Sequence, residues 1–131
     1  MQKISSETNA LNWFEIPAAD IYRAKKFYEA ILDIQLEEPT EMMGMHMSFF
    51  PYNPMSGKVS GGLVQGPMHS PSMDGSVIYL NANPAIQEVI DRVENAGGKI
   101  LMPKTLINEE IGYMAFIADT EGNRIALHAG N

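Results

Sequence analysis

Three short segments of the sequence place polar or aromatic residues at alternate positions. They are Trp13 and Glu15, then Tyr79 and Asn81, and finally His128, which follows Ala126 by two residues. Because successive side chains of a β-strand point to opposite faces, each set is expected to lie on one face. An indole, a phenol, an amide, a carboxylate and an imidazole suit a site for a small polar-aromatic molecule. Since carboxylates and imidazoles hold metals and move protons, Glu15 and His128 are the candidate catalytic residues.

The residues on the opposite faces of these segments are uniformly apolar. They are Phe14 and Ile16, Ile78 and Leu80, and Ile125 and Leu127. This asymmetry predicts strands that pack one face under helices and turn the other toward a cleft. Simpler interpretations stay open for each cleft residue: Trp13 and Tyr79 as packing rings, Glu15 at a sheet edge, and His128 exposed near the end of the chain.

The elements that would position these residues occur twice in the same order. In the first half, a strand over 11–16 precedes a helix over 20–32 that Asp20 caps, and extended segments follow over 34–38, 45–50 and 59–65. In the second half, a strand over 76–81 precedes a helix over 84–95, and strands follow over 99–102, 111–118 and 124–128. Asn83 is predicted to cap the second helix, with Pro84 at its first position.

The two halves align with a constant offset, which indicates an internal repeat. Ile16 and Leu80 lie 64 residues apart, and so do Pro39 and Pro103. The turn-rich segment 66–75 is the expected connector between module one, about 11–65, and module two, about 76–128. We therefore predict one domain over 1–131 of the α+β class, with two βαβββ modules, mixed sheets curved around a shared cleft, and helices outside.

Composition excludes several function classes. The formal net charge of -7 disfavours binding to nucleic acid or to anionic lipid surfaces. The chain has no cysteine, so it has no thiol nucleophile and no cysteine-based metal site. No apolar run approaches the roughly 18 residues that span a bilayer, and the first residues lack an apolar signal core. We expect a cytoplasmic protein with no membrane and no nucleic-acid partner.

Three sequence motifs carry a resemblance to a known superfamily. The segment from Asn12 to Tyr28 contains Asp20-Ile-Tyr-Arg-Ala-Lys-Lys-Phe-Tyr28, the second half contains Gly97-Gly98-Lys99, and the last hairpin contains Asp119-Thr-Glu-Gly-Asn-Arg-Ile125. Together they resemble the vicinal oxygen chelate superfamily, which includes glyoxalase I, bleomycin-resistance proteins and extradiol dioxygenases. The resemblance covers about 11–128. It implies the two-module fold, a cleft lined by the faces described above, and a homodimer.

The resemblance also implies where a divalent metal would bind. Carried over to this sequence, the four ligand positions fall near Leu11, Leu63, Val77 and Ala126, none of which can bind a metal. Gln65 lies two residues after Leu63 and would share its face. We therefore expect no cofactor and no metal at the usual place, and we predict a glyoxalase-like protein that binds a small organic molecule. The candidate ligand-binding residues are Trp13, Glu15, Gln65, Tyr79, Asn81 and His128.

Two other functional hypotheses stay open. In the first, the chain is a metal-dependent lyase, isomerase or dioxygenase, similar to lactoylglutathione lyase or to a dioxygenase, that holds a relocated ion with Glu15, His128 and Gln65. Its weakness is the small number of donors. In the second, the chain is a structural or partner-binding domain. His46 and His69 are assigned no role, because each is a single histidine without a second ligand at metal spacing. The methionines over 42–47 are either a packing strand or an adaptable apolar wall.

Overall fold

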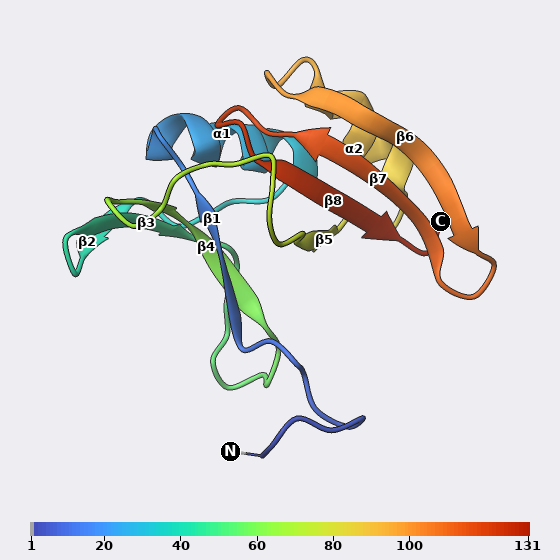
Figure 1. Cartoon of the computed structure of the whole chain (residues 1–131), viewed down its shortest axis with the longest axis horizontal. Coiled ribbons are helices and arrows are strands. Elements are labelled where there is room, and N and C mark those ends of the chain that lie inside the picture. Colours follow the sequence, from blue (N-terminus) through green and yellow to red (C-terminus); the bar gives the residue numbers. More distant parts are fainter. Residues whose placement is uncertain (1) are drawn as a thin grey trace.

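Two four-stranded sheets and two helices make up the fold of residues 2–131, which the computed structural model describes (Figure 1). The elements in chain order are β1 (Trp13–Pro17), α1 (Ile21–Leu32), β2 (Thr40–Met42), β3 (Met45–Phe49), β4 (Ser60–Gln65), β5 (Tyr79–Asn81), α2 (Ile86–Val93), β6 (Lys99–Asn108), β7 (Gly112–Ala118) and β8 (Arg124–Ala129). The order of elements is that of two βαβββ modules, and the predicted α+β class is confirmed.

The two sheets have the same strand order, β1-β4-β3-β2 in module one and β5-β8-β7-β6 in module two. The first and last strands of each module pair in parallel, and the other pairs are antiparallel. Ile16 pairs with Leu63, and Leu80 pairs with Leu127. Each residue of the second pair lies 64 positions after its counterpart in the first pair, which confirms the internal repeat.

The helices cover the outer side of the arch that the two sheets form (Figure 1). Helix α1 packs on β3 and β4, α2 packs on β6, β7 and β8, and the two helices contact each other. Three of the apolar residues predicted for this face, Ile16, Leu80 and Leu127, are buried, and Leu63, which was predicted to face the cleft, is buried here too. Burial of these aliphatic groups is the main favourable contribution to folding.

Helix α1 begins and packs as the sequence predicts. The Asp20 side chain accepts hydrogen bonds from the backbone N–H groups of Tyr22 and Arg23 at 3.1 and 3.2 Å. Such a cap satisfies donors that have no partner within the helix. The buried stripe consists of Ile21, Ala24, Phe27, Tyr28 and Ile31.

The predicted start of the second helix is wrong. Helix α2 begins at Ile86 after Ala85, and no side chain caps it. Asn83 instead accepts a hydrogen bond from the Gly130 N–H at 2.9 Å and donates one to Asn81 at 2.7 Å. Its side chain therefore ties β5 to the end of the chain, and the helix can begin only two residues later.

Two predicted strands also need correction. The segment 34–38 is not a strand, although the Glu37 N–H donates to the Phe49 carbonyl at 2.9 Å; the short strand β2 follows it instead. Strand β6 extends to Asn108, well beyond the predicted end at 102, and pairs with β7 through register shifts. Pro103 fits inside β6 because this strand is at the sheet edge, where a missing N–H is tolerated.

A buried polar contact joins the two modules. The Tyr28 hydroxyl of α1 donates to Asp119 Oδ2 at 2.6 Å, and Asn123 Nδ2 donates to the Pro17 carbonyl at 2.7 Å. Burial raises the pKa of Tyr28 well above its usual value near 10, and the Asp119 carboxylate raises it further. Gly122 supplies the positive φ, 96°, that the hairpin before β8 requires.

The same hairpin bonds to the start of α1. Glu121 accepts hydrogen bonds from the Asp20 N–H and from Arg23 Nε, both at 2.7 Å. Burial opposes ionisation of Glu121, but these hydrogen bonds outweigh it and hold the pKa of the carboxyl below its usual value.

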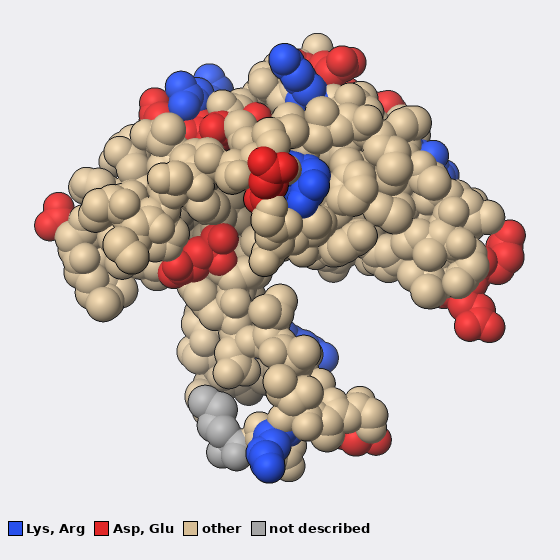
Figure 2. All heavy atoms as spheres, in the orientation of Figure 1, with Lys and Arg blue, Asp and Glu red and all other residues tan. Residues whose placement is uncertain are grey.

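A stem formed by residues 2–12 and by the loop over 50–59 projects from the arch (Figure 1). The space-filling view shows a notch between this stem and the second sheet, with few charged side chains on its visible walls (Figure 2). Within residues 2–131, no helix is long and apolar enough to cross a membrane.

Candidate functional site

A cavity of about 930 Å³ lies between the first strands of the two modules. Trp13 and Glu15 line it from β1, and Tyr79 and Asn81 line it from β5. Val77 lies on the same wall, two residues before Tyr79. The structure therefore brings four of the six candidate ligand-binding residues to one cavity.

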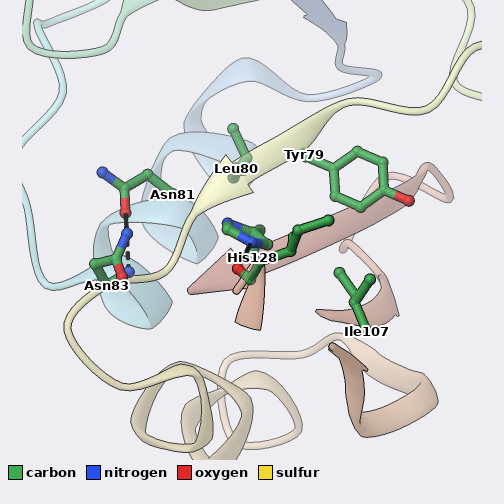
Figure 3. Close-up of a pocket in the computed structure, with 7 residues that line it drawn as sticks. Tyr79, Leu80, Asn81, Asn83, Ile107 and His128 are labelled. Carbon is green, nitrogen blue, oxygen red and sulfur yellow. Dashed lines mark hydrogen bonds between the residues drawn. The ribbon is translucent and has the colours of Figure 1, made fainter. Parts of the chain in front are cut away.

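His128 lies in a different cavity, of about 460 Å³, which adjoins the first along β5. Its ring Nε2 is 2.7 Å from the Ile111 carbonyl oxygen, on the hairpin between β6 and β7. Figure 3 shows His128 among Tyr79, Leu80 and Ile107, with Asn81 bonded to Asn83 nearby. The structure thus does not bring His128 to Glu15, its predicted catalytic partner.

Glu15 has a different partner, which sequence reasoning missed. His69 Nε2 lies 2.7 Å from Glu15 Oε1, and the side chains are 17% and 34% exposed. His69 belongs to the connector, where a short bridge between Gly66 and His69 shapes the turn. No periodicity in the connector relates it to β1, so no sequence signal could have paired these residues.

Gln65 lies on the helix side of β4, so its predicted place in the cleft is corrected. Its side-chain oxygen accepts a hydrogen bond from the Ile21 N–H at 2.8 Å, at the first turn of α1. The strand register gives the reason: Glu15 pairs with Gly62, as Tyr79 pairs with Ala126. The equivalent of Ala126 is therefore Gly62 and not Leu63, so Leu63 and Gln65 both point to the helices.

Trp13 contacts two aromatic rings beside the cavity. Its ring centroid is 5.6 Å from that of Phe49 and 5.3 Å from that of Tyr52, both edge to face with interplanar angles of 75°. Trp13 therefore packs and also presents part of its surface to the cavity. The methionines over 42–47 do not line this cavity; Met47 is buried and Met43 is exposed.

Comparison with known families identifies the superfamily of this fold. The sequence model of the Glyoxalase/Bleomycin resistance protein/Dioxygenase superfamily matches residues 10–127. The chain belongs to this superfamily. No curated protein matches the sequence.

Solved structures of the superfamily show the same fold at low sequence identity. A glyoxylase/bleomycin resistance protein/dioxygenase domain from Frankia sp. is 12% identical, with a TM-score of 0.68, and the match covers 95% of this chain and all of that one. The V278E mutant of glyoxalase I from Zea mays is 16% identical, with a TM-score of 0.66 over 90% of this chain and 45% of that one. The chain thus spans about half the length of the maize enzyme. The trypanothione-dependent glyoxalase I of Leishmania major is 20% identical, with a TM-score of 0.62 over 94% and 88% of the two chains.

The residues at the superfamily's metal positions do not fit a metal in this chain. The 64-residue offset makes Trp13, rather than the predicted Leu11, the equivalent of Val77, just as Gly62 replaces Leu63. The four positions are therefore Trp13, Gly62, Val77 and Ala126, whose side chains carry no carboxylate, imidazole or thiolate. Among residues 2–131 there is also no group of three or more histidine, aspartate or glutamate side chains placed to hold an ion.

Proposed function

We propose that this superfamily member binds a small organic molecule in the 930 Å³ cavity between its modules, without a metal at the usual positions. The observation that supports this is the convergence of Trp13, Glu15, Tyr79 and Asn81 on one cavity. Ligand sites combine mostly apolar walls with a few polar groups that fix orientation, and their volumes range from about 300 to 1,000 Å³. The cavity has both properties.

The relocated-metal hypothesis has less support. It requires Glu15, Gln65 and His128 to share one ion, whereas each bonds to a different element. Glu15 bonds to the connector, Gln65 to the start of α1, and His128 to the hairpin before β7. We therefore favour ligand binding over metal-dependent lyase, isomerase or dioxygenase activity.

We also propose that the protein forms a homodimer. Strand β6 is an edge strand of ten residues, and it exposes Leu101, Leu106 and Ile107. Long edges with apolar side chains gain burial when they pair with a second copy. Light scattering at micromolar concentration is expected to give the mass of a dimer, and a monomer at all concentrations would contradict the proposal.

The test of ligand binding uses a metabolite panel in a thermal-shift screen, followed by a titration of each hit against the Trp13 signal. Trp13 is the only tryptophan of the chain and lines this cavity, so its fluorescence is expected to change when a ligand enters the cavity. Val77→Phe narrows the cavity and is expected to abolish the response. Ile111→Phe is the matched control, because Ile111 lines the neighbouring 460 Å³ cavity instead. Loss of binding in the control but not in Val77→Phe would place the ligand in the 460 Å³ cavity and would contradict the proposal.

A further inference from the structure

A third cavity, of about 220 Å³, adjoins the large one. Glu15, Ser76 and Ile78 line both cavities, so the two meet at these side chains. We call the smaller one the rear cavity. The rest of its polar lining comes from the connector and the start of β8, namely Ser70, Ser72, Asp74, Asn123 and Arg124.

Charged groups follow one another along the two cavities. Among the described residues that line the large cavity, Glu15 is the one charged side chain, and the others are apolar, aromatic or neutral polar. In the rear cavity Arg124 is the one cationic residue of the lining, which also includes Glu15 and the exposed Asp74. A ligand that extends from one cavity to the other therefore passes an apolar wall, then a carboxylate, then a guanidinium.

Glu15 is held in place by His69 while keeping an oxygen for a ligand. The contact of 2.7 Å joins His69 Nε2 to Oε1 of the carboxylate. No hydrogen bond to Oε2 is found within residues 2–131, and the side chain is 34% exposed. A carboxylate with one oxygen fixed and one oxygen open suits a cationic donor such as an ammonium group. His69 acts here as a positioning residue.

The Arg124 guanidinium group also has one nitrogen that is held by a hydrogen bond and others without a partner. Its Nη2 donates to the Gly75 carbonyl at 2.9 Å. Within residues 2–131, two buried side-chain nitrogens have no hydrogen-bond partner, and Arg124 Nε is one of them; the other is His69 Nδ1. Nε is therefore closed to a ligand, whereas Nη1, for which no hydrogen bond is found within residues 2–131, is the nitrogen that can donate to an acceptor in the rear cavity.

We propose that the two cavities together bind a zwitterionic, amino-acid-like ligand, with its ammonium on Glu15, its carboxylate on Arg124 and its apolar side chain in the large cavity. This rests on the proposed function of the large cavity. A ligand with a carboxylate alone would leave Glu15 Oε2 without a donor. A ligand with an ammonium alone would leave Arg124 Nη1 without an acceptor. Only a ligand with both groups satisfies both residues, and the apolar walls favour a large side chain.

The experiment compares four ligands that share a phenyl group: phenylalanine, phenethylamine, 3-phenylpropanoate and 2-phenylethanol. Each is titrated into the ¹⁵N-labelled full chain, and the single indole N–H signal of Trp13 gives the dissociation constant. Phenylalanine is expected to bind tightest, by roughly fivefold to tenfold over phenethylamine, because it adds a charge-assisted hydrogen bond. The propanoate is expected to bind more weakly than phenylalanine, because it keeps the contact with Arg124 but offers no ammonium group to Glu15.

Paired variants assign the two charges. Glu15→Gln is expected to weaken phenylalanine and phenethylamine by roughly fivefold to tenfold and to leave 2-phenylethanol unchanged. Arg124→Gln should weaken phenylalanine and spare phenethylamine; if it fails to fold, Arg124→Lys keeps the charge and should give a smaller loss. Glu41→Gln and Lys99→Gln remove one charge each outside both cavities and should change nothing.

The test of His69 must distinguish positioning of Glu15 from a purely structural role. His69→Gln is expected to weaken phenylalanine and phenethylamine while sparing 2-phenylethanol, and to add no further loss in a Glu15→Gln background. An equal loss for all ligands would assign His69 to folding of the connector and would overturn its positioning role.

The outcomes separate this inference from the proposed function. Equal affinities for phenylalanine and 2-phenylethanol would overturn the zwitterion inference and leave the cavity as a ligand site. Tightest binding of 3-phenylpropanoate would also overturn it, because Glu15 would then not contact the ligand. No response of Trp13 to any of the four would contradict both proposals.

Discussion

Modules one and two share their strand order and register, yet they differ on one face of each sheet. On the helix side, Ile16 and Leu63 correspond to Leu80 and Leu127, all buried aliphatic residues. On the cavity side, Trp13 corresponds to Val77 and Glu15 to Tyr79. Close packing under a helix constrains size and polarity, whereas a wall of a solvent-filled cavity does not. At these positions the modules keep aliphatic residues on the helix side and differ on the cavity side, where a ligand is proposed to bind.

The largest expected effect tests whether the two helix sides are equivalent. Leu63→Ala and Leu127→Ala each remove a fully buried side chain at matched positions. Each is expected to lower the free energy of unfolding by roughly 2–5 kcal/mol, because lost transfer energy adds to the cost of a cavity. Urea unfolding measures both. A loss below about 1 kcal/mol in one module alone would break the comparison.

The contact between modules gives the next effect. Tyr28→Phe removes the hydroxyl that donates to Asp119 and is expected to cost roughly 1–3 kcal/mol, because the carboxylate loses a buried donor. Its pH dependence has a definite sign. The folded state keeps Tyr28 protonated, since its pKa is raised, so the stabilisation is complete below the unfolded pKa near 10 and is lost as the pH rises above it.

Unfolding curves between pH 8 and 11 check this prediction. The wild-type chain should lose stability above about pH 10 more steeply than Tyr28→Phe does. The same slope in both proteins would mean that another group controls the alkaline limb.

The starts of the two helices give smaller changes in stability, a loss for α1 and a gain for α2. Asp20→Ala removes the cap of α1 and should cost roughly 1 kcal/mol, since two N–H groups lose their acceptor. Ala85→Ser places a hydroxyl at the uncapped start of α2, where the backbone is extended, and should stabilise by up to about 1 kcal/mol. Thermal unfolding of both variants measures the pair. An unchanged stability of Asp20→Ala, or a loss of stability in Ala85→Ser, would contradict the difference in capping.

The smallest effect concerns the cavity side. Tyr79 is 52% exposed, and Tyr79→Phe removes a hydroxyl for which no hydrogen bond is found within residues 2–131. We expect a change in unfolding free energy within about 0.5 kcal/mol, as for other exposed sites without a special contact. A loss above 1 kcal/mol in urea unfolding would show that the cavity wall is part of the core and would weaken the ligand proposal.

Much of the fold follows from local pattern. The Asp20 cap and the apolar stripe of α1 are visible in the sequence because they depend on residues within a few positions of one another. The 64-residue repeat is visible because both modules use the same spacing. The start of α2 was misplaced because Asn83, a common capping residue, bonds instead to Gly130 at the far end of the chain.

The amino-acid sequence by itself determined the two βαβββ modules and the apolar helix sides of β1, β5 and β8. Only the tertiary structure decided that Glu15 bonds to His69, that His128 lies in a separate cavity, and that Gln65 faces α1. The physical reason is the separation in sequence between the residues that contact each other. Periodicity fixes which residues of a strand share a face, but pairing register and the path of a connector depend on contacts between residues far apart in the chain.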